Sequence, residues 1–234
     1  NNITMSMKSK IIALGDSIIK GVILNIEDNG KLHYAVSEQN IVDRVAEDLH
    51  LEVINLGKMG CTIDSGEGIV DRHLVGIGDA KYALLCYGGN DSDYNWRSIA
   101  LSPKCEHYPK TPIAQFEKTY SRIIDKVRKA GLIPLVMSLP PMDAEKYYKF
   151  FTSMFSHEEK RNISRWLKGG SDAIYAGHEL YNDAVKRVAS AADVQMIDVS
   201  NAFHDTQKYL CVDGIHPNKA GQEKIAKTIA KAIV

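Results

Sequence analysis

Five short apolar runs recur along the chain, and each is apolar at consecutive positions rather than at alternate ones. Runs of this kind, rich in β-branched residues, are typical of strands that are buried on both faces of a parallel sheet. They predict strands at residues 10–14, 53–56, 82–87, 133–138 and 194–199. The pattern therefore indicates a sheet that is covered on both sides.

A different hydrophobic period lies between these runs. Apolar side chains that recur three or four positions apart form one face of a helix. Segments with this spacing are 37–50, 112–130, 176–192 and 218–233. Alternating strands and helices predict right-handed βαβ units, and therefore a parallel sheet with helices on both faces.

The segment from about 140 to 172 is too long for a simple connection between a strand and the next helix. It contains MDAEKYYKFFTSMF and then SHEEKRNISRWLKGG, which predict an inserted pair of helices. No internal repeat, low-complexity stretch or linker divides the rest of the chain. We therefore expect one domain over residues 1–234, with a helical insert at about 140–172.

The charge balance argues against several classes of partner. Lys and Arg together number 29, as do Asp and Glu, so the formal net charge is zero. This balance disfavours a broad nucleic-acid interface, and no apolar run reaches the roughly 18 residues of a membrane span. We expect no nucleic-acid partner and no stable membrane anchor, whereas the sequence leaves the oligomeric state open.

The cysteines indicate neither a zinc site nor a redox pair. The four cysteines lie at positions 61, 86, 105 and 211, without C-x-x-C spacing. The start of the sequence has no apolar signal segment with a cleavage site. These features suit a cytoplasmic protein with reduced thiols, or a secreted one whose signal peptide was removed before residue 1.

Small polar residues follow the ends of the predicted strands. In open parallel sheets, ligands bind beyond the carboxyl ends of the strands. The segments at these positions include 15–17 (Gly-Asp-Ser), 57–60, 88–91 (Gly-Gly-Asn-Asp) and 213–216 (Asp-Gly-Ile-His). Their convergence at one edge of the sheet predicts a functional site there.

Ser17, Asp213 and His216 are residue types that can form a nucleophilic relay. A serine becomes a nucleophile when a base lies within hydrogen-bond reach and a third group orients that base. If the last loop folds over the same edge, His216 can accept the Ser17 proton while Asp213 holds the other ring nitrogen. The alternative is structural, with Ser17 only capping its helix and either Asp213 or Asn218 capping the last one.

An acyl-transfer site also needs hydrogen-bond donors for the oxyanion. The candidates are the backbone N–H groups of Ser17 and Gly60 and the side-chain amide of Asn90. Gly60 has no Cβ, so its N–H can approach a ligand closely. The structural alternatives are a turn glycine and a turn or capping asparagine.

These segments together resemble the GDSL/SGNH hydrolase family of serine esterases and lipases. The matching blocks are 15–18 (GDSI), 57–60 with its two glycines, 88–91 (GGND) and 213–217 (DGIHP), in the family's order. The family's first block usually ends in leucine, and Ile18 stands there in this chain, a change that conserves volume. The resemblance implies a flavodoxin-like, three-layer α/β/α fold around the five predicted parallel strands, with no cofactor and no metal.

The same resemblance implies the roles of the site residues. Ser17 would be the nucleophile, His216 the base and Asp213 its orienting partner, while Ser17, Gly60 and Asn90 would form the oxyanion hole. The expected function is hydrolysis of short-chain or small-acyl carboxylic esters through an acyl-enzyme, with acetylated carbohydrate as a candidate substrate. The alternatives are a thioesterase or lysophospholipase of the same family, and a non-catalytic flavodoxin-like module that binds a small ligand.

Aromatic side chains near these blocks are candidates for the wall of a substrate pocket. They are Tyr87, Tyr94, Trp96, Tyr148, Phe151 and Trp166. Flat rings with a polar tip suit sugars or small aromatic esters, so the expected partner is a small-molecule ester. The insert either covers the nucleophile as a wall or lid, or only packs against the body, and the sequence leaves both open.

Overall fold

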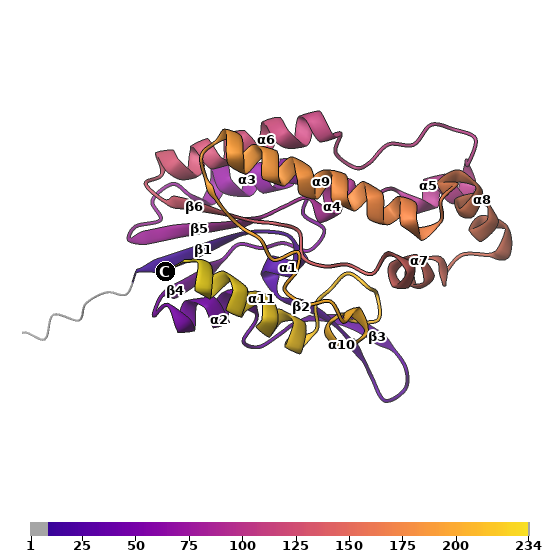
Figure 1. Cartoon of the computed structure of the whole chain (residues 1–234), viewed down its shortest axis with the longest axis horizontal. Coiled ribbons are helices and arrows are strands. Elements are labelled where there is room, and N and C mark those ends of the chain that lie inside the picture. Colours follow the sequence, from indigo (N-terminus) through magenta and orange to yellow (C-terminus); the bar gives the residue numbers. More distant parts are fainter. Residues whose placement is uncertain (1–8, 234) are drawn as a thin grey trace, which may run out of the picture.

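A five-stranded parallel sheet forms the centre of the computed structural model, which describes residues 9–233 (Figure 1). In sheet order the strands are β4 (Glu52–Asn55), β1 (Lys10–Gly15), β5 (Ala80–Cys86), β6 (Ile133–Met137) and β7 (Gln195–Ile197). Every pairing between neighbours in this sheet is parallel. Each strand overlaps one of the predicted apolar runs, so the predicted sheet is confirmed.

Strand β1 shows why these runs are apolar at consecutive positions. Ile12 and Leu14 pack into the core on one face of the sheet, whereas Ile11 and Ala13 pack into the core on the other. All four side chains are fully buried. A strand that is buried on both faces offers no position for an exposed polar residue, which removes the usual alternation.

Helices cover both faces of the sheet and complete a three-layer α/β/α fold (Figure 1). One face carries α3 (Ile63–His73), α6 (Ile113–Lys129) and α9 (Ser171–Ala191). The other carries α2 (Ile41–Asp48) and α11 (Lys219–Ala232). The four predicted helical segments correspond to α2, α6, α9 and α11, whereas the sequence patterns above do not predict α3.

Four short helices lie in the connections. They are α1 (Ser17–Lys20), α4 (Gly89–Ser92), α5 (Trp96–Leu101) and α10 (Thr206–Tyr209). Each spans at most two turns, which is too short for a hydrophobic period to be recognised in the sequence. Two of them, α1 and α4, begin directly beyond the carboxyl ends of β1 and β5, and they carry residues of the predicted site.

A two-stranded antiparallel hairpin, β2 (Val22–Ile26) and β3 (Leu32–Val36), follows α1. The apolar periodicity above does not predict it. Its turn contains Asn29 and Gly30, and Gly30 adopts a φ of 80°. An Asn-Gly pair between two strand-like runs is a strong hairpin signal, so the sequence does contain the feature that identifies it.

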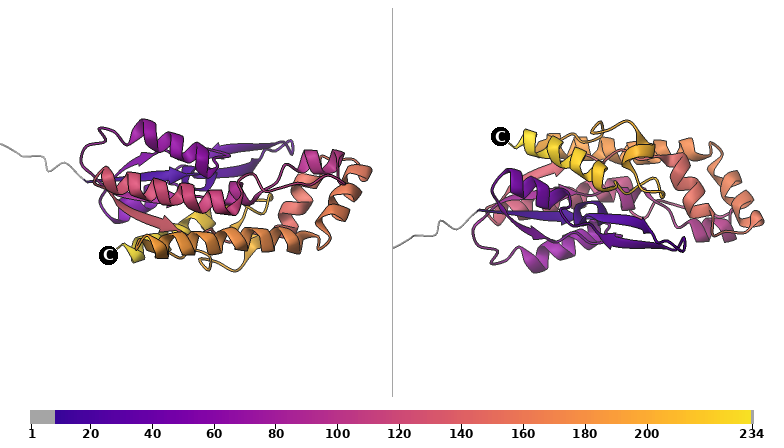
Figure 2. Two further views of the ribbon diagram at one scale, coloured as in Figure 1. Left: turned by 90° about the horizontal axis from the view of Figure 1, so that it is seen from above. Right: turned by 90° about the horizontal axis from the view of Figure 1, so that it is seen from below.

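Two helices, α7 (Ala144–Thr152) and α8 (His157–Leu167), occupy the range of the expected insert. Together with α5 they form one end of the molecule, far from the C-terminus in every view (Figure 1, Figure 2). A small aromatic core joins them, in which Phe151 stacks on Trp96 with ring centroids 4.5 Å apart. The insert therefore has packing of its own beside the sheet.

Candidate active site

Ser17 is the first residue of α1, directly beyond the carboxyl end of β1. The chain turns at Gly15, where a Cβ would lie 2.3 Å from the carbonyl oxygen of Cys86. Asp16 is the N-cap of the helix, because its Oδ1 accepts a hydrogen bond from the Ile18 N–H at 2.9 Å. The capping role considered for Ser17 thus belongs to its neighbour.

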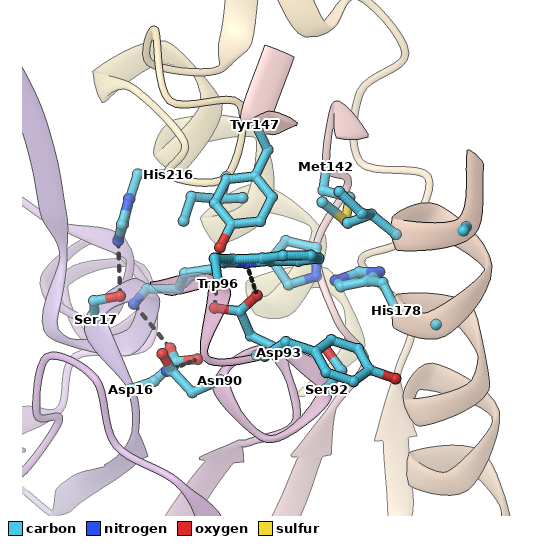
Figure 3. A pocket seen from close by; sticks show the side chains of 18 of the residues that line it. Asp16, Ser17, Asn90, Ser92, Asp93, Trp96, Met142, Tyr147, His178 and His216 are labelled. Carbon is cyan, nitrogen blue, oxygen red and sulfur yellow. Dashed lines mark hydrogen bonds between the residues drawn. The ribbon is translucent and has the colours of Figure 1, made fainter. Parts of the chain in front are cut away.

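The loop before α11 brings His216 onto Ser17, although 199 positions separate them (Figure 3). Ser17 Oγ lies 2.8 Å from His216 Nε2, and His216 Nδ1 lies 2.6 Å from Asp213 Oδ2. Asn218 is the N-cap of α11, since its Oδ1 accepts from the Gly221 N–H at 3.0 Å. The three side chains are therefore hydrogen-bonded in a row, while other residues cap the helices.

Backbone hydrogen bonds hold Asp213 in place within this loop. Its Oδ1 accepts from the N–H groups of Ile215 and His216, each at 3.1 Å. The side chain is fully buried, and burial disfavours its charged form. The hydrogen bonds and the positive potential of His216, together with the two N–H groups, outweigh burial and place the pKa of Asp213 below its ordinary value.

Asn90, on α4, lies beside Ser17 and is attached to Asp16. Its Nδ2 donates to Asp16 Oδ2 at 3.4 Å, and a primary amide carries a second N–H besides the one used there. Burial raises the pKa of Asp16 to about 6, although the Ile18 N–H and the nearby His216 act to lower it. Asp16 thus caps α1 and orients the Asn90 amide at the same time.

Gly60, the third expected donor, has a different position. It lies on an exposed turn before α3 with a φ of 72°, and it is not among the residues that line the cavity beside Ser17. A Cβ at this position would meet nothing within 4 Å. The structure therefore brings Ser17 and Asn90 together at the cavity and leaves Gly60 outside its wall.

A cavity of about 250 Å³ opens beside Ser17 and His216 (Figure 3). Its walls come from α1, the segment that contains α4 and α5, the insert, α9 and the loop before α11. Among the six aromatic candidates, Tyr94, Trp96 and Trp166 line it. The rings of Tyr94 and Trp166 meet edge to face with centroids 4.9 Å apart, so they form a continuous aromatic surface.

The other three aromatic candidates do not line this cavity. Tyr87 is fully buried in the main core, where its ring meets Tyr120 edge to face at 5.6 Å. Phe151 lies behind Trp96 as a second layer, and Tyr148 packs against Phe151 in the small core of the insert. Aromatic residues that are close in sequence point in different directions, which composition alone does not reveal.

The pocket candidates taken from the sequence do not include several polar residues of the cavity wall, among them Asp93, Tyr147 and His178. Asp93 accepts from Trp96 Nε1 at 2.9 Å and from the Tyr147 hydroxyl at 3.0 Å (Figure 3). It thereby joins the segment after β5 to the insert. Asp93 lies two positions after the third sequence block, which is a usable signal, whereas no local pattern places His178 near the site.

The insert is also attached to the loop that carries Asp213. The Asp143 N–H, at the start of α7, donates to the Gly214 carbonyl at 2.8 Å. Thr206 Oγ1 donates to the Asp143 carboxylate, also at 2.8 Å. Gly214 has a φ of 73°, and a Cβ there would lie 2.6 Å from the Asp143 carbonyl oxygen. Both its conformation and this close contact require glycine.

Within residues 9–233, no group of three or more His, Cys, Asp or Glu side chains is arranged to hold a metal ion. Over the same range, no helix is both long enough and apolar enough to cross a membrane. The four cysteines are free thiols; Cys105 is exposed and the other three are buried.

The three-layer fold and the site at the carboxyl edge of its sheet are those of a carboxylic ester hydrolase. The chain belongs to the GDSL-like lipase/acylhydrolase family, whose model matches residues 13–224. The match includes all four sequence blocks, from GDSI to DGIHP, and confirms the family resemblance.

The individual proteins that resemble this chain share a quarter or less of its sequence. The uncharacterized protein YpmR of Bacillus subtilis (strain 168) is 25% identical over 234 residues, which cover 95% of this chain and 80% of YpmR. The acetylxylan esterase Axe2 from Geobacillus stearothermophilus has 17% identity and a TM-score of 0.61, over 97% of this chain and 94% of that structure. LAE5, an α/β hydrolase enzyme from the metagenome of Lake Arreo, Spain, has 20% identity and a TM-score of 0.64, over 97% of this chain and 95% of that structure. At these identities the structures establish a similar fold.

Proposed function

We propose that this protein is a serine esterase that cleaves small-acyl carboxylic esters through an acyl-enzyme on Ser17. The observation that carries the proposal is the row of hydrogen bonds from Ser17 through His216 to Asp213. It joins a nucleophile, a base and a group that orients the base, which are the parts that acyl transfer from an ester requires.

In the first half of the reaction, His216 Nε2 accepts the Ser17 proton while Oγ forms a bond to the ester carbonyl carbon. Negative charge develops on the carbonyl oxygen, where the Asn90 amide and the Ser17 N–H, which both belong to residues of the cavity wall, are the proposed donors. Asp213 stabilises the imidazolium. The C–O bond to the alcohol then breaks, and His216 gives its proton to the departing oxygen.

Water completes the cycle in the second half. His216, now neutral, accepts a proton from a water molecule that attacks the acyl carbon. The bond between that carbon and Ser17 Oγ breaks, the serine recovers its proton and the carboxylic acid leaves. The burial of Ser17 and His216, at 7% and 4% exposure, reduces competition from bulk water for these hydrogen bonds.

The size of the cavity favours a substrate with a small acyl group. Its volume of about 250 Å³ lies below the usual range for sites that enclose drug-sized ligands, which begins near 300 Å³. Tyr94, Trp96 and Trp166 supply flat surfaces on which a sugar ring can pack, and Asp93 and His178 supply polar groups nearby. The similarity of the fold to acetylxylan esterases supports acetylated carbohydrate as the candidate substrate.

We infer that the insert serves as a fixed wall of this cavity. Helix α7 is hydrogen-bonded through Asp143 and Gly214 to the loop before α11, residues 210–218, which we call the relay loop. It is also hydrogen-bonded to the segment after β5 through Tyr147 and Asp93. A segment held on both sides of the cavity has less freedom to swing than a lid on a single hinge.

A chain-length series of esters tests the proposed specificity. We expect p-nitrophenyl acetate and butyrate to be hydrolysed with kcat/KM at least about tenfold above that of the palmitate, because the cavity is small. Acyl-CoA and lysophospholipid assays run beside the series. Faster turnover of palmitate, of an acyl-CoA or of a lysophospholipid would replace the short-acyl proposal, and no turnover of any ester would favour a non-catalytic binding module.

The contact between the insert and the relay loop gives a second prediction. We expect Gly214→Ala to lower the free energy of unfolding by roughly 2–4 kcal/mol, because it adds left-handed strain and a clash with Asp143. Its kcat/KM should also fall, since the clash displaces Asp213. Gly131→Ala is the matched control, because Gly131 has a φ of 83° with open space around a Cβ.

Gly131→Ala should therefore show the strain alone, with kcat/KM unchanged. Thermal unfolding and p-nitrophenyl acetate kinetics measure the two effects separately. Equal stability losses in both variants, together with full activity of Gly214→Ala, would show that the contact with the insert is unimportant.

A further inference from the structure

We propose that Tyr34, on hairpin strand β3, is a positioning residue that holds the Asp213 carboxylate and sets the strength of His216 as a base. This inference rests on the function proposed above. The Tyr34 hydroxyl donates to Asp213 Oδ2 at 3.2 Å. The same oxygen lies 2.6 Å from His216 Nδ1, so the tyrosine and the histidine share one acceptor atom.

The arrangement of donors explains why this hydroxyl matters. Asp213 Oδ1 already accepts from two backbone N–H groups, which leaves Oδ2 to face the imidazole. A second donor on Oδ2 fixes the rotation of the carboxylate and withdraws part of its negative charge from His216. Burial and the nearby Asp213 raise the pKa of Tyr34 far above its ordinary value, so the phenol remains a donor.

The Tyr34 ring also restricts the imidazole. The two rings meet edge to face, with centroids 5.4 Å apart and an interplanar angle of 61°. Tyr34 is 39% exposed, whereas His216 is 4% exposed, so the tyrosine lies between the relay and solvent. Removing only the hydroxyl should keep this packing and isolate the effect of the hydrogen bond.

The hairpin is attached to both ends of the relay. It follows α1 at Gly21, whose carbonyl accepts from the Ser37 N–H at 2.8 Å. The Leu24 N–H contacts Cys211 Sγ at 3.4 Å, and Leu24 pairs with Tyr34 across the hairpin. Tyr34 is therefore positioned by the helix that carries the nucleophile and by the loop that carries the base.

Other titratable groups act on the same pair. Asp16 lies at the cap of α1, Cys211 lies in the loop before α11, and Tyr147 lies on α7, where Lys146 acts on Cys211. Burial raises the pKa of Asp16 to about 6, so its own titration falls within the pH range of the experiment. These groups are the same in the wild type and in a Tyr34 variant, so a difference between the two pH profiles reports on Tyr34.

The test compares the pH dependence of kcat/KM for p-nitrophenyl acetate in the wild type and in Tyr34→Phe. We expect kcat/KM at the optimum to fall roughly tenfold, the effect of losing one hydrogen bond to a charged group. The acid limb of the kcat/KM profile, where the rate rises with pH, should move to higher pH by roughly half a unit. Without the Tyr34 hydrogen bond, the Asp213 carboxylate holds the His216 proton more strongly. The position of this limb does not depend on the fraction of folded enzyme.

Leu32→Ala is the matched control. Leu32 is two positions from Tyr34 on β3 and 41% exposed. Its substitution should leave both kcat/KM and the acid limb of the pH profile unchanged. The proposed role of Tyr34 is wrong if Tyr34→Phe has the pH profile of the wild type, or if Leu32→Ala shifts the profile as much as Tyr34→Phe does. Either result leaves the esterase proposal intact.

Proton NMR gives a readout that does not need turnover. The His216 Nδ1–H resonance should change its chemical shift in Tyr34→Phe and remain in place in Leu32→Ala. An unchanged resonance in Tyr34→Phe would overturn the inference even if the enzyme is inactive toward every ester tried. Wild-type inactivity toward every ester, in contrast, would overturn only the proposed function.

Discussion

Replacing Ser17 with alanine should reduce kcat/KM for p-nitrophenyl acetate by roughly 10⁴- to 10⁶-fold, the range seen when the nucleophile of a serine relay is removed. The reason is chemical, because the hydroxyl that hydrogen-bonds to His216 Nε2 is that of Ser17, with Oγ 2.8 Å from the ring nitrogen. The fold should be preserved, since Asp16 and not Ser17 caps α1. Steady-state kinetics and thermal unfolding measure both effects.

Covalent labelling makes this expectation specific. A fluorophosphonate probe should modify the wild type at Ser17 and leave Ser17→Ala unlabelled. Ser121→Ala is the matched control: Ser121 lies on α6, donates only to the Glu117 carbonyl and is not part of the cavity lining. It should keep full activity and full labelling. Retention of more than about a tenth of the wild-type activity in Ser17→Ala would rule out the acyl-enzyme proposal.

Asp213→Asn should lower kcat/KM by roughly 10³- to 10⁴-fold without unfolding the protein. The new amide oxygen can still accept from the Ile215 and His216 N–H groups, as Oδ1 does in the wild type. Its NH₂ group then faces His216 Nδ1. A donor at that position places the imidazole proton on Nε2, so the ring can no longer accept the Ser17 proton.

Asp205→Asn is the control for this substitution. Asp205 is exposed and caps α10 by accepting from the Lys208 N–H at 3.0 Å, a role that asparagine also performs. It should change neither the activity nor the thermal unfolding. A loss of less than about tenfold in Asp213→Asn would mean that the carboxylate does not orient the base.

The hydrophobic pattern alone was sufficient to predict the parallel sheet and four of the helices that cover it. The run at residues 10–14 predicts a strand buried on both faces, and Ile11, Ile12, Ala13 and Leu14 are fully buried in β1. Burial on both faces demands apolar side chains at consecutive positions, so the constraint is local and is written in the sequence. The hairpin was missed because its signal, Asn29-Gly30, lies in a turn and not in an apolar period.

The local sequence pattern does not predict the direction in which a side chain points. Tyr87 and Trp96 are both aromatic residues near the third sequence block, yet Tyr87 is in the main core and Trp96 lines the cavity. Which of them faces a ligand depends on how α5 and the insert pack, which involves contacts far apart in the chain. Tyr34 illustrates the same point, because nothing near it in the sequence indicates a contact with Asp213.

By itself, the sequence determined the five strands of the parallel sheet, four of the helices that cover it, the family blocks and the residue types at the edge of the sheet, since each of these depends on neighbouring positions. Only the tertiary structure decided that Asp16 and Asn218 cap their helices, which leaves Ser17 and Asp213 to bond with His216. Hydrogen bonds between residues 199 positions apart depend on the closure of the whole chain around the sheet, and no local pattern encodes that geometry.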